Sequence, residues 1–456
     1  MAQPRHGDLV LARFNAYLNA DTPAAFAPAQ QPETLYNSYA TLTAALQELA
    51  SAYPTLCELR SIGQSRQGRE LWVMRITDNP GMEEAEPEFK YISTMHGDEP
   101  VGTELTLYLI QRLLEHYDDD ARMAYLVDNT DISILPLMNP DGRENGTREN
   151  ANGRDLNRVF PVYPRDFTQT IFEAPLNTSG RQPEVRHVME WSAANSFVLS
   201  ANLHTGALLV NYPYDEDGRP SGANAPSPDD ALFRVISLQY AQENPPMFAS
   251  SLFPNGISNG SDWFAIDGGM QDWNYRFLTC AEVTIELSNT KRPNATTLPQ
   301  FWEDNEESLV RYMEAVHEYG VRGIITDRST DEPVWARVTV TGNTQPVLSD
   351  PGIGDYYRLL LPGAYTLRFE SPGYILFTAA NIDVASGTPT VVDVSLSTGD
   401  LNGDTRVNAV DVQSIVAALL RGDTAQGSPY DVDGRGVTST DLQRIVNIAL
   451  GRGGDL

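Results

Sequence analysis

The chain has 456 residues, more than one hydrophobic core usually organises, so the sequence predicts two or three domains. Hydrophobic residues make up 41% of the chain. No apolar run approaches the roughly 18 residues of a membrane span, which argues against one. The formal net charge of −29 would repel nucleic-acid phosphates and therefore disfavours nucleic-acid binding.

The cysteines and the N-terminal residues say little about the compartment in which the protein acts. Cys57 and Cys280 permit at most one disulfide, and the sequence leaves open whether they pair. The first residues contain no apolar signal-peptide core, so either the protein stays inside the cell or its signal peptide is not present in this chain. Residues 1–34, rich in Ala, Pro and Gln, are interpreted as an N-terminal extension or linker.

Residues 35–319 alternate between helical and strand-like patterns. Helical periodicity is found at 39–52 and 102–116, and short strand-like runs at 71–76, 132–135 and 283–287. This alternation predicts an α/β domain in which helices flank a mixed sheet.

After Gly320 the pattern changes to short runs of period two. They lie at 336–340, 365–369 and 391–396, with turn signals at 362–363 and 372–373, so residues 320–398 are predicted to form a small all-β sandwich. Residues 399–456 contain an internal repeat, because the segment 411–416 recurs as 441–446 behind a second Asp-rich loop. Each repeat predicts a loop followed by an amphipathic helix.

A metal-ligand pattern is found at 96–99, where His96 and Glu99 form HxxE. This pattern alone is weak, because short matches arise by chance in a chain with six histidines. A catalytic zinc also needs a third protein ligand and an open position for water. His204 follows a strand-like run at 196–200 and is a candidate for that ligand.

Residues 36–319 resemble the zinc metallocarboxypeptidases, in particular the regulatory subgroup that includes carboxypeptidases N, E, M and D. The matching stretches occur in the same order along the chain, at 61–65, 95–99, 139–142, 155–158, 203–206, 211–215, 269–275 and 284–288. Two histidines and a glutamate hold zinc in carboxypeptidase A. The resemblance therefore implies that His96, Glu99 and His204 bind zinc, and that Glu286 acts as general base on the zinc-bound water.

The resemblance also implies roles in substrate binding. Arg148 matches the arginine that stabilises the oxyanion, while Asn157 and Arg158 match the pair that binds the terminal carboxylate of the substrate. Asp215 and Gln271 match specificity-pocket positions in the members that prefer basic residues, so we expect removal of C-terminal Lys or Arg. Alternatively, Asp215 belongs, together with Glu216 and Asp217, to an exposed acidic loop.

One position departs from the family pattern. The family carries a mobile tyrosine twenty-two residues before the general base, and this chain has Phe264 there. A phenylalanine can cover the substrate but cannot hydrogen-bond to it, so weaker binding is expected rather than lost chemistry. Tyr275 is an alternative hydroxyl if the register differs.

The appended parts resemble known modules as well. Residues 321–397 resemble the transthyretin-like domain of the regulatory carboxypeptidases, and residues 400–453 resemble a type I dockerin, a duplicated calcium-loop module that docks onto cohesins. Oxygen ligands stand at positions 1, 3, 5 and 12 of the first loop, the spacing that calcium requires; these are Asp400, Asn402, Asp404 and Asp411. The second loop, with Asp431, Asp433 and Asp441, is one residue shorter, which leaves its calcium binding open.

The sequence therefore predicts a secreted or cell-surface zinc carboxypeptidase that acts on peptide or protein C-termini and has a cohesin-like partner. Two alternatives remain. One is a catalytically weak carboxypeptidase-like protein that serves in binding or anchoring. The other is a related zinc hydrolase that acts on peptidoglycan or small amides, against which Asn157 and Arg158 argue because they require a free carboxylate.

Overall fold

The computed structural model describes residues 35–404, 406–426 and 428–450, so the predicted extension at residues 1–34 lies outside it. The chain divides into two compact units, Met1–Ala315 and Val316–Leu456. In the described part of the chain, none of the helices combines the length and the hydropathy needed to cross a membrane. Cys57 and Cys280 are both buried free thiols.

The first unit is built on one eight-stranded mixed sheet with the order β1-β2-β4-β3-β5-β8-β6-β7. Its strands are β1 (Cys57–Gln64), β2 (Glu70–Ile76), β3 (Glu88–Ser93), β4 (Asp131–Leu135), β5 (Phe197–His204), β6 (Leu208–Tyr212), β7 (Ile257–Asn259) and β8 (Ala281–Leu287). The central strands β4, β3, β5 and β8 run parallel to one another. All residues of β3, β4 and β5 are buried, as expected for parallel strands that are covered on both faces.

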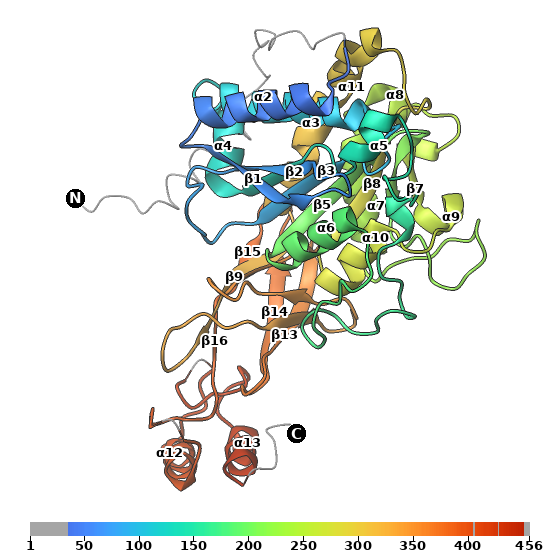
Figure 1. The fold of residues 1–456 in the computed structure, drawn as a ribbon. Helices are drawn as coiled ribbons and strands as arrows, with labels where there is room; N and C mark the ends of the chain where they lie inside the picture. Colours follow the sequence, from blue (N-terminus) through green and yellow to red (C-terminus); the bar gives the residue numbers. More distant parts are fainter. Residues whose placement is uncertain (1–34, 405, 427, 451–456) are drawn as a thin grey trace. The chain divides into compact units, whose positions relative to one another are not determined.

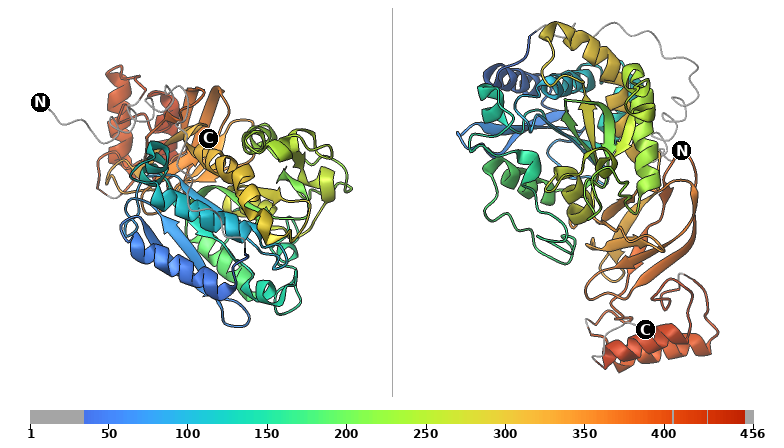
Figure 2. Two further views of the ribbon diagram at one scale, coloured as in Figure 1. Left: turned by 90° about the horizontal axis from the view of Figure 1, so that it is seen from above. Right: turned by 90° about the vertical axis from the view of Figure 1, so that its right-hand side faces the viewer.

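Helices cover both faces of this sheet (Figures 1 and 2). The longer helices are α2 (Tyr39–Ala52), α3 (Val101–Glu115), α4 (Ala121–Asn129), α6 (Pro183–Ala193), α7 (Asp230–Gln242) and α11 (Leu298–Glu314). The shorter ones are α5 (Pro140–Asn145), α8 (Pro245–Phe248), α9 (Gly260–Phe264) and α10 (Met270–Trp273), with the single turns η1 (Leu156–Arg158), η2 (Pro254–Gly256), η3 (Asn274–Leu278), η4 (Ala295–Thr297) and η5 (Ala315–His317). One core cluster joins α6 and α10 to the sheet through Val188, Trp273 and Ile92.

One buried polar network ties the turn η3, which follows α10, to the centre of the sheet. Lys90 on β3 is fully buried, and its ammonium donates to Ser192 and to the side chain of Asn274, which in turn donates to Glu282 on β8. Buried charged groups are stable only when hydrogen-bonded in this way. The network fixes the start of η3, and with it α10, against the parallel strands.

The second unit contains the predicted all-β sandwich. One sheet has the order β11-β10-β13-β14 and the other β12-β9-β15, with β16 also paired to β9. The strands are β9 (Val321–Asp327), β10 (Arg337–Val340), β11 (Val347–Leu348), β12 (Asp355–Arg358), β13 (Gly363–Glu370), β14 (Phe377–Val384), β15 (Thr390–Val391) and β16 (Val394–Leu396). The run predicted at 391–396 is thus divided between two short strands, both parallel to β9.

The same unit ends in two helices that each follow an Asp-rich loop, α12 (Ala409–Leu420) and α13 (Ser439–Ala449). Both helices begin with a capping box, in which Asn408 or Thr438 caps the helix and the aspartate three residues later bonds back. Ile415 and Ile445 pack together in one small core, which also includes Ile375 from the loop between β13 and β14. The predicted repeat of loop and helix is therefore present twice.

Candidate active site

The three predicted metal ligands converge at the carboxyl end of the parallel strands. His96 and Glu99 lie in the turn between β3 and α3, and His204 is the last residue of β5. One ligand atom from each residue lies within 4.8 Å of the others, and all three side chains are buried. The strand order explains this convergence, because β3 and β5 are parallel neighbours and end at the same edge of the sheet.

The geometry and the donor set fit a zinc ion. Nδ1 of His204 lies 3.0 Å from Nδ1 of His96 and 2.9 Å from Oε2 of Glu99. Two nitrogens in a tetrahedral zinc site are about 3.3 Å apart, since each Zn–N bond is about 2.0–2.1 Å. Burial opposes ionisation of Glu99, but hydrogen bonds from His204 and His96 outweigh it and lower the pKa of this carboxyl group, which keeps it anionic.

A second layer of residues orients these ligands. Oδ1 of Asp155 lies 2.9 Å from Nε2 of His96, which turns the other ring nitrogen towards Glu99 and His204. Oδ2 of Asp155 accepts a hydrogen bond from Nε of Arg148 at 2.9 Å. The sequence alone predicts no role for Asp155, which lies two residues before Asn157 in the matching stretch 155–158. The signal in the sequence was a carboxylate close to Asn157 and Arg158, the predicted substrate-binding pair.

Glu286 lies next to the metal ligands, because β8 pairs with β5 in a register that puts it opposite His204. Burial, followed by the charge of Glu99, raises the pKa of Glu286 to about 8. Its Oε2 atom is inaccessible to solvent and has no hydrogen-bond partner among the described residues. A carboxyl group in this state has a higher proton affinity than a solvated one.

One pocket brings the predicted site residues together. All three metal ligands line it, as do Glu286, Arg148, Asn157, Arg158, Asp215 and Phe264. Gln271 does not line the pocket directly, but its Nε2 atom donates to Oδ1 of Asp215 at 3.2 Å. Lys291 also lines the pocket, and its Nζ lies 3.1 Å from Oε1 of Glu99. No role for Lys291 is predicted from the sequence. Its position five residues after Glu286 was the only indication that it lies near the site.

Two neighbouring residues present the expected anchor for a carboxylate. Asn157 is buried in the turn η1, and its Oδ1 atom accepts a hydrogen bond from the backbone of Met270 at 2.9 Å. Nη1 of Arg158 donates to the backbone oxygen of Asn157 at 2.8 Å. Burial lowers the pKa of Arg158, which nevertheless remains a cation at neutral pH.

Asp215 lies at the buried end of the pocket and is only 2% exposed, whereas Asp217 two residues later is exposed. The environment of its carboxylate does not fit the alternative of a solvated acidic loop. Oδ1 of Asn211 and Oε1 of Gln271 are also buried, and neither has a hydrogen-bond partner among the described residues. Asn211 lines the pocket beside Asp215, whereas Gln271 contacts Asp215 from outside the lining.

Phe264 ends α9 at the mouth of the pocket and is 60% exposed. It presents a ring at this position without a hydroxyl group. Tyr275, the alternative hydroxyl, is buried and donates to Oδ2 of Asp229 at 2.8 Å. Tyr275 is also absent from the pocket lining, so it does not replace the missing hydroxyl group.

The two Asp-rich loops of the second unit differ in how their carboxylates are arranged. In the first loop, Oδ1 of Asp411 accepts backbone hydrogen bonds from Leu401 and Asn402. In the second loop, carboxylate oxygens of Asp431, Asp433 and Asp441 lie within 4.8 Å of one another, and all three residues are buried. The shorter second loop therefore still brings its three carboxylates together.

Fold and site together define a protein of the zinc carboxypeptidase class. Residues 42–308 match the zinc carboxypeptidase family, residues 320–397 match the carboxypeptidase regulatory-like domain, and residues 398–449 match the dockerin type I domain. The chain belongs to the zinc carboxypeptidase family. The family and fold class predicted from the sequence are confirmed.

Several relatives place the chain in the regulatory subgroup. Carboxypeptidase D of Homo sapiens is 40% identical over 407 residues, which cover 84% of this chain and 29% of that protein. Carboxypeptidase M of Mus musculus is 40% identical over 361 residues, which cover 74% of this chain and 79% of that protein. The chain thus spans less than a third of the carboxypeptidase D relatives.

Among solved structures, carboxypeptidase A from Helicoverpa armigera superposes with a TM-score of 0.51 at 22% identity. The superposition covers 68% of this chain and 80% of that one. This likeness shows that the two proteins share a fold.

Proposed function

We propose that this protein is a zinc metallocarboxypeptidase that hydrolyses the C-terminal peptide bond of peptides or proteins and prefers C-terminal Lys or Arg. One observation carries the proposal. The three convergent ligand side chains His96, Glu99 and His204 line the same pocket as a carboxyl group of raised pKa, Glu286, and two arginines. These groups supply the ligands, base and cations that metal-assisted peptide hydrolysis requires.

Each residue has a distinct role in this proposal. His96, Glu99 and His204 would hold a zinc ion, which would act as a Lewis acid and lower the pKa of a bound water molecule. Glu286 would take a proton from the attacking water, a step that its raised pKa favours, and would then deliver this proton to the leaving amine. The guanidinium group of Arg148 stabilises the negative charge that develops on the carbonyl oxygen.

Asn157 and Arg158 bind the terminal carboxylate of the substrate and thereby make the enzyme an exopeptidase. A planar guanidinium can hold a carboxylate through two parallel hydrogen bonds. Substrates without a free carboxylate would lose these hydrogen bonds with the half-buried Arg158, which costs binding energy. The proposal therefore favours C-terminal peptide hydrolysis over hydrolysis of small amides.

The preference for Lys or Arg rests on the acceptor oxygens at and next to Asp215. Asp215 supplies a negative charge, and the oxygens of Asn211 and Gln271 lack donors. A lysine or arginine side chain brings a positive charge with three or five N–H donors. An apolar side chain would bury these acceptors without partners, so it is expected to bind more weakly.

The proposal is tested with N-blocked peptides that end in Arg, Lys or Phe, assayed with and without a zinc chelator. We expect chelator-sensitive release of Arg and Lys, and release of Phe at least tenfold slower. Activity that persists without zinc would overturn the proposal as a whole. A preference for Phe would overturn only the specificity, and Asp215→Asn should abolish the basic preference while the zinc content stays the same.

The second unit suggests where the enzyme acts. We further propose the domain division predicted above, with the catalytic domain at 35–319, the sandwich at 320–398 and the dockerin module at 399–456. In this proposal the module binds calcium, docks onto a cohesin-like partner, and places the enzyme outside the cell or on its surface, where calcium is millimolar. Surface side chains near the start of each helix, Val410 in α12 and Thr440 in α13, are exposed and available to a partner.

A further inference from the structure

The backbone that carries Asp215 is held by an unusual set of contacts. The carboxylate of Asp272, in α10, accepts the backbone N–H of Asp215 at 3.0 Å and 3.1 Å through its two oxygens. Its Oδ2 atom also accepts the N–H of Glu216 at 3.1 Å. Hydrogen bonds to an ionised acceptor are stronger than those between neutral groups. One carboxylate thus holds two successive peptide groups.

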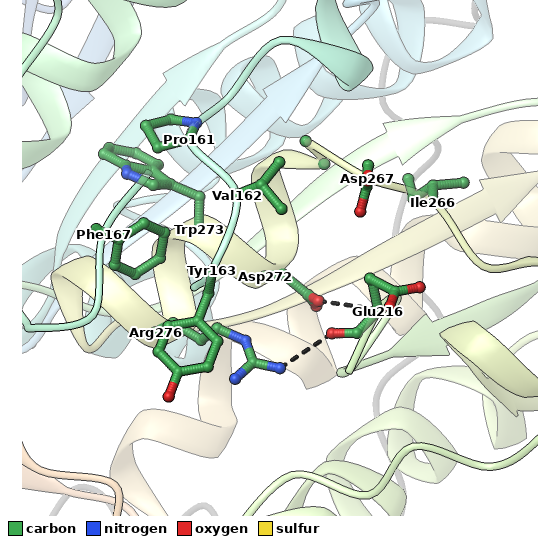
Figure 3. Close-up of a pocket in the computed structure, with 12 residues that line it drawn as sticks. Pro161, Val162, Tyr163, Phe167, Glu216, Ile266, Asp267, Asp272, Trp273 and Arg276 are labelled. Atoms are coloured by element: carbon green, nitrogen blue, oxygen red, sulfur yellow. Dashed lines mark hydrogen bonds between the residues drawn. The ribbon is translucent and has the colours of Figure 1, made fainter. Parts of the chain in front are cut away.

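A cation holds the same segment from its carbonyl side. Nη2 of Arg276, four residues after Asp272, donates to the backbone oxygen of Glu216 at 3.0 Å. Figure 3 shows Asp272 and Arg276 reaching Glu216 from one stretch of the chain. The anion therefore binds the N–H groups and the cation binds the carbonyl group, so both contacts are charge-assisted.

Two aromatic rings fix the guanidinium group of Arg276. Its central carbon lies 3.4 Å from the ring centroid of Tyr214 and 4.6 Å from that of Tyr163. Tyr214 directly precedes Asp215, whereas Tyr163 belongs to the long loop before α6. Arginine is well suited to this position because its planar group can stack and hydrogen-bond at once, which an ammonium group cannot do.

The carboxylate of Asp215 has no room to move sideways, because the backbone at two glycines lies close to it. A Cβ atom added at Gly260 would lie 2.1 Å from Oδ1 of Asp215, and one added at Gly269 would lie 3.1 Å from Oδ2. The side chain of Asp215 is therefore confined between two backbone segments, while Asp272 and Arg276 fix its own backbone. A shift of the backbone would move the carboxylate directly.

We infer that Asp272 and Arg276 are positioning residues for substrate recognition, which together clamp residues 214–216 and set the place of the Asp215 carboxylate in the specificity pocket. This inference rests on the proposed preference for Lys and Arg. Neither residue lines the pocket of the metal ligands, so neither is expected to contact the substrate. Replacing either residue should therefore change the preference for C-terminal Lys or Arg rather than the rate of the hydrolytic step.

The charge of Asp272 gives the clamp an electrostatic consequence. Burial and the neighbouring carboxylate of Asp272 raise the pKa of Asp215 well above its usual value, while Arg158 opposes this change. Burial likewise raises the pKa of Asp272 to about 6, and Arg276 opposes this change. A cationic substrate side chain relieves the repulsion between two nearby carboxylates, which a neutral side chain does not.

The test compares Asp272→Asn with Asp267→Asn. Asp267 lines the same small pocket as Asp272 in Figure 3, but its side chain is 61% exposed and its nearest cation, Arg165, lies 4.0 Å away. An asparagine at 272 keeps the size but places an N–H₂ group against a backbone N–H. We expect KM for peptides ending in Arg to rise about tenfold, with kcat and the kinetics for peptides ending in Ala unchanged. Asp267→Asn should match the wild type.

Arg276 provides a second, less drastic pair of variants. Arg276→Met should lower the ratio of kcat/KM for Arg over Ala several-fold, and Arg276→Lys should restore it only in part because an ammonium cannot stack between two rings. Thermal melting and zinc content establish that each variant is folded. If Asp272→Asn does not fold, the two Arg276 variants decide the inference.

The outcomes separate this inference from the function on which it rests. If the wild type shows no preference for Arg over Ala, both the proposed specificity and the clamp are wrong. If the wild type prefers Arg but Asp272→Asn and Arg276→Met keep the wild-type ratio, the clamp is wrong and the specificity stands. Equal losses for Arg and Ala peptides would also overturn it, because they would indicate a general structural role.

Discussion

Nε2 of His96 lies 2.9 Å from Oδ1 of Asp155, a residue 59 positions further along the chain. This contact fixes which ring nitrogen of His96 faces the other two metal ligands. Because a metal-bound histidine binds best when its second nitrogen donates to a carboxylate, Asp155→Asn should weaken zinc binding about 10- to 100-fold. Competition with a chromogenic chelator measures the affinity. Wild-type affinity in this variant would contradict the assigned contact, and Asp267→Asn provides a surface control.

Replacement of Glu286 tests the proposed base. Glu286→Gln keeps the size of the side chain but cannot accept a proton, so kcat should fall by a factor of about 10² to 10⁴. Zinc content and KM should change little, because Glu286 is not one of the three convergent ligands. A variant that retains zinc and turns over at the wild-type rate would exclude Glu286 as the base. The alternative of a non-catalytic binding protein predicts no turnover to lose in the wild type.

Phe264 offers a gain-of-function experiment. The ring lies exposed at the mouth of the pocket, so Phe264→Tyr adds a hydroxyl group there without a burial cost. One new hydrogen bond to the substrate should raise kcat/KM about 2- to 10-fold, mainly through KM. Phe248→Tyr is a matched control, because Phe248 is 39% exposed and absent from the pocket lining. An equal change in both variants would argue against a role for residue 264.

The preference for basic residues should depend on pH. The raised pKa of Asp215 means that its carboxyl group is protonated at a higher pH than usual, and only the ionised form attracts a cation. The groups that face it are Asp272, Arg158, Asn211 and Gln271. The ratio of kcat/KM for Arg over Ala peptides should therefore rise with pH above the range in which a solvated aspartate titrates. A ratio independent of pH would show that Asp215 stays ionised throughout.

Calcium should bind to the second loop as well as to the first. Three buried carboxylates held within 4.8 Å repel one another unless a cation lies between them. Calorimetric titration of the full chain should detect two calcium ions, and Asp441→Ala should leave one. Asp383→Ala is a control outside both loops. A stoichiometry of one in the wild type would show that the shorter loop is not a calcium site.

Much of the local structure could be predicted from sequence patterns alone. The helix at 39–52 has the predicted bounds, because its period and its capping residue Ser38 are local properties. The run at 391–396 was less predictable, since its division into β15 and β16 follows from pairing with β9. Strand breaks of this kind depend on the partner strand and not on the run itself.

The candidate site was accessible to sequence reasoning where ordered motifs resemble a known family, as for His96, Glu99 and Glu286. Asp155 and Lys291 were missed because their only signal in the sequence is that they lie near predicted site residues. Their importance comes from a partner that is distant in the chain. The same applies to Asp272 and Arg276, whose hydrogen bonds to Asp215 and Glu216 span 56 to 60 residues.

The sequence by itself determined the family, the order of the modules and the residue types that can bind zinc, because these depend on motifs and periodicity along the chain. Only the tertiary structure decided which atoms meet. His96 and His204 are 108 residues apart, and their ring nitrogens come within 3.0 Å because parallel strands β3 and β5 end at one sheet edge. Likewise, only the tertiary structure shows that Asp215, which stands in an acidic run of the sequence, is buried and lines the pocket of the metal ligands.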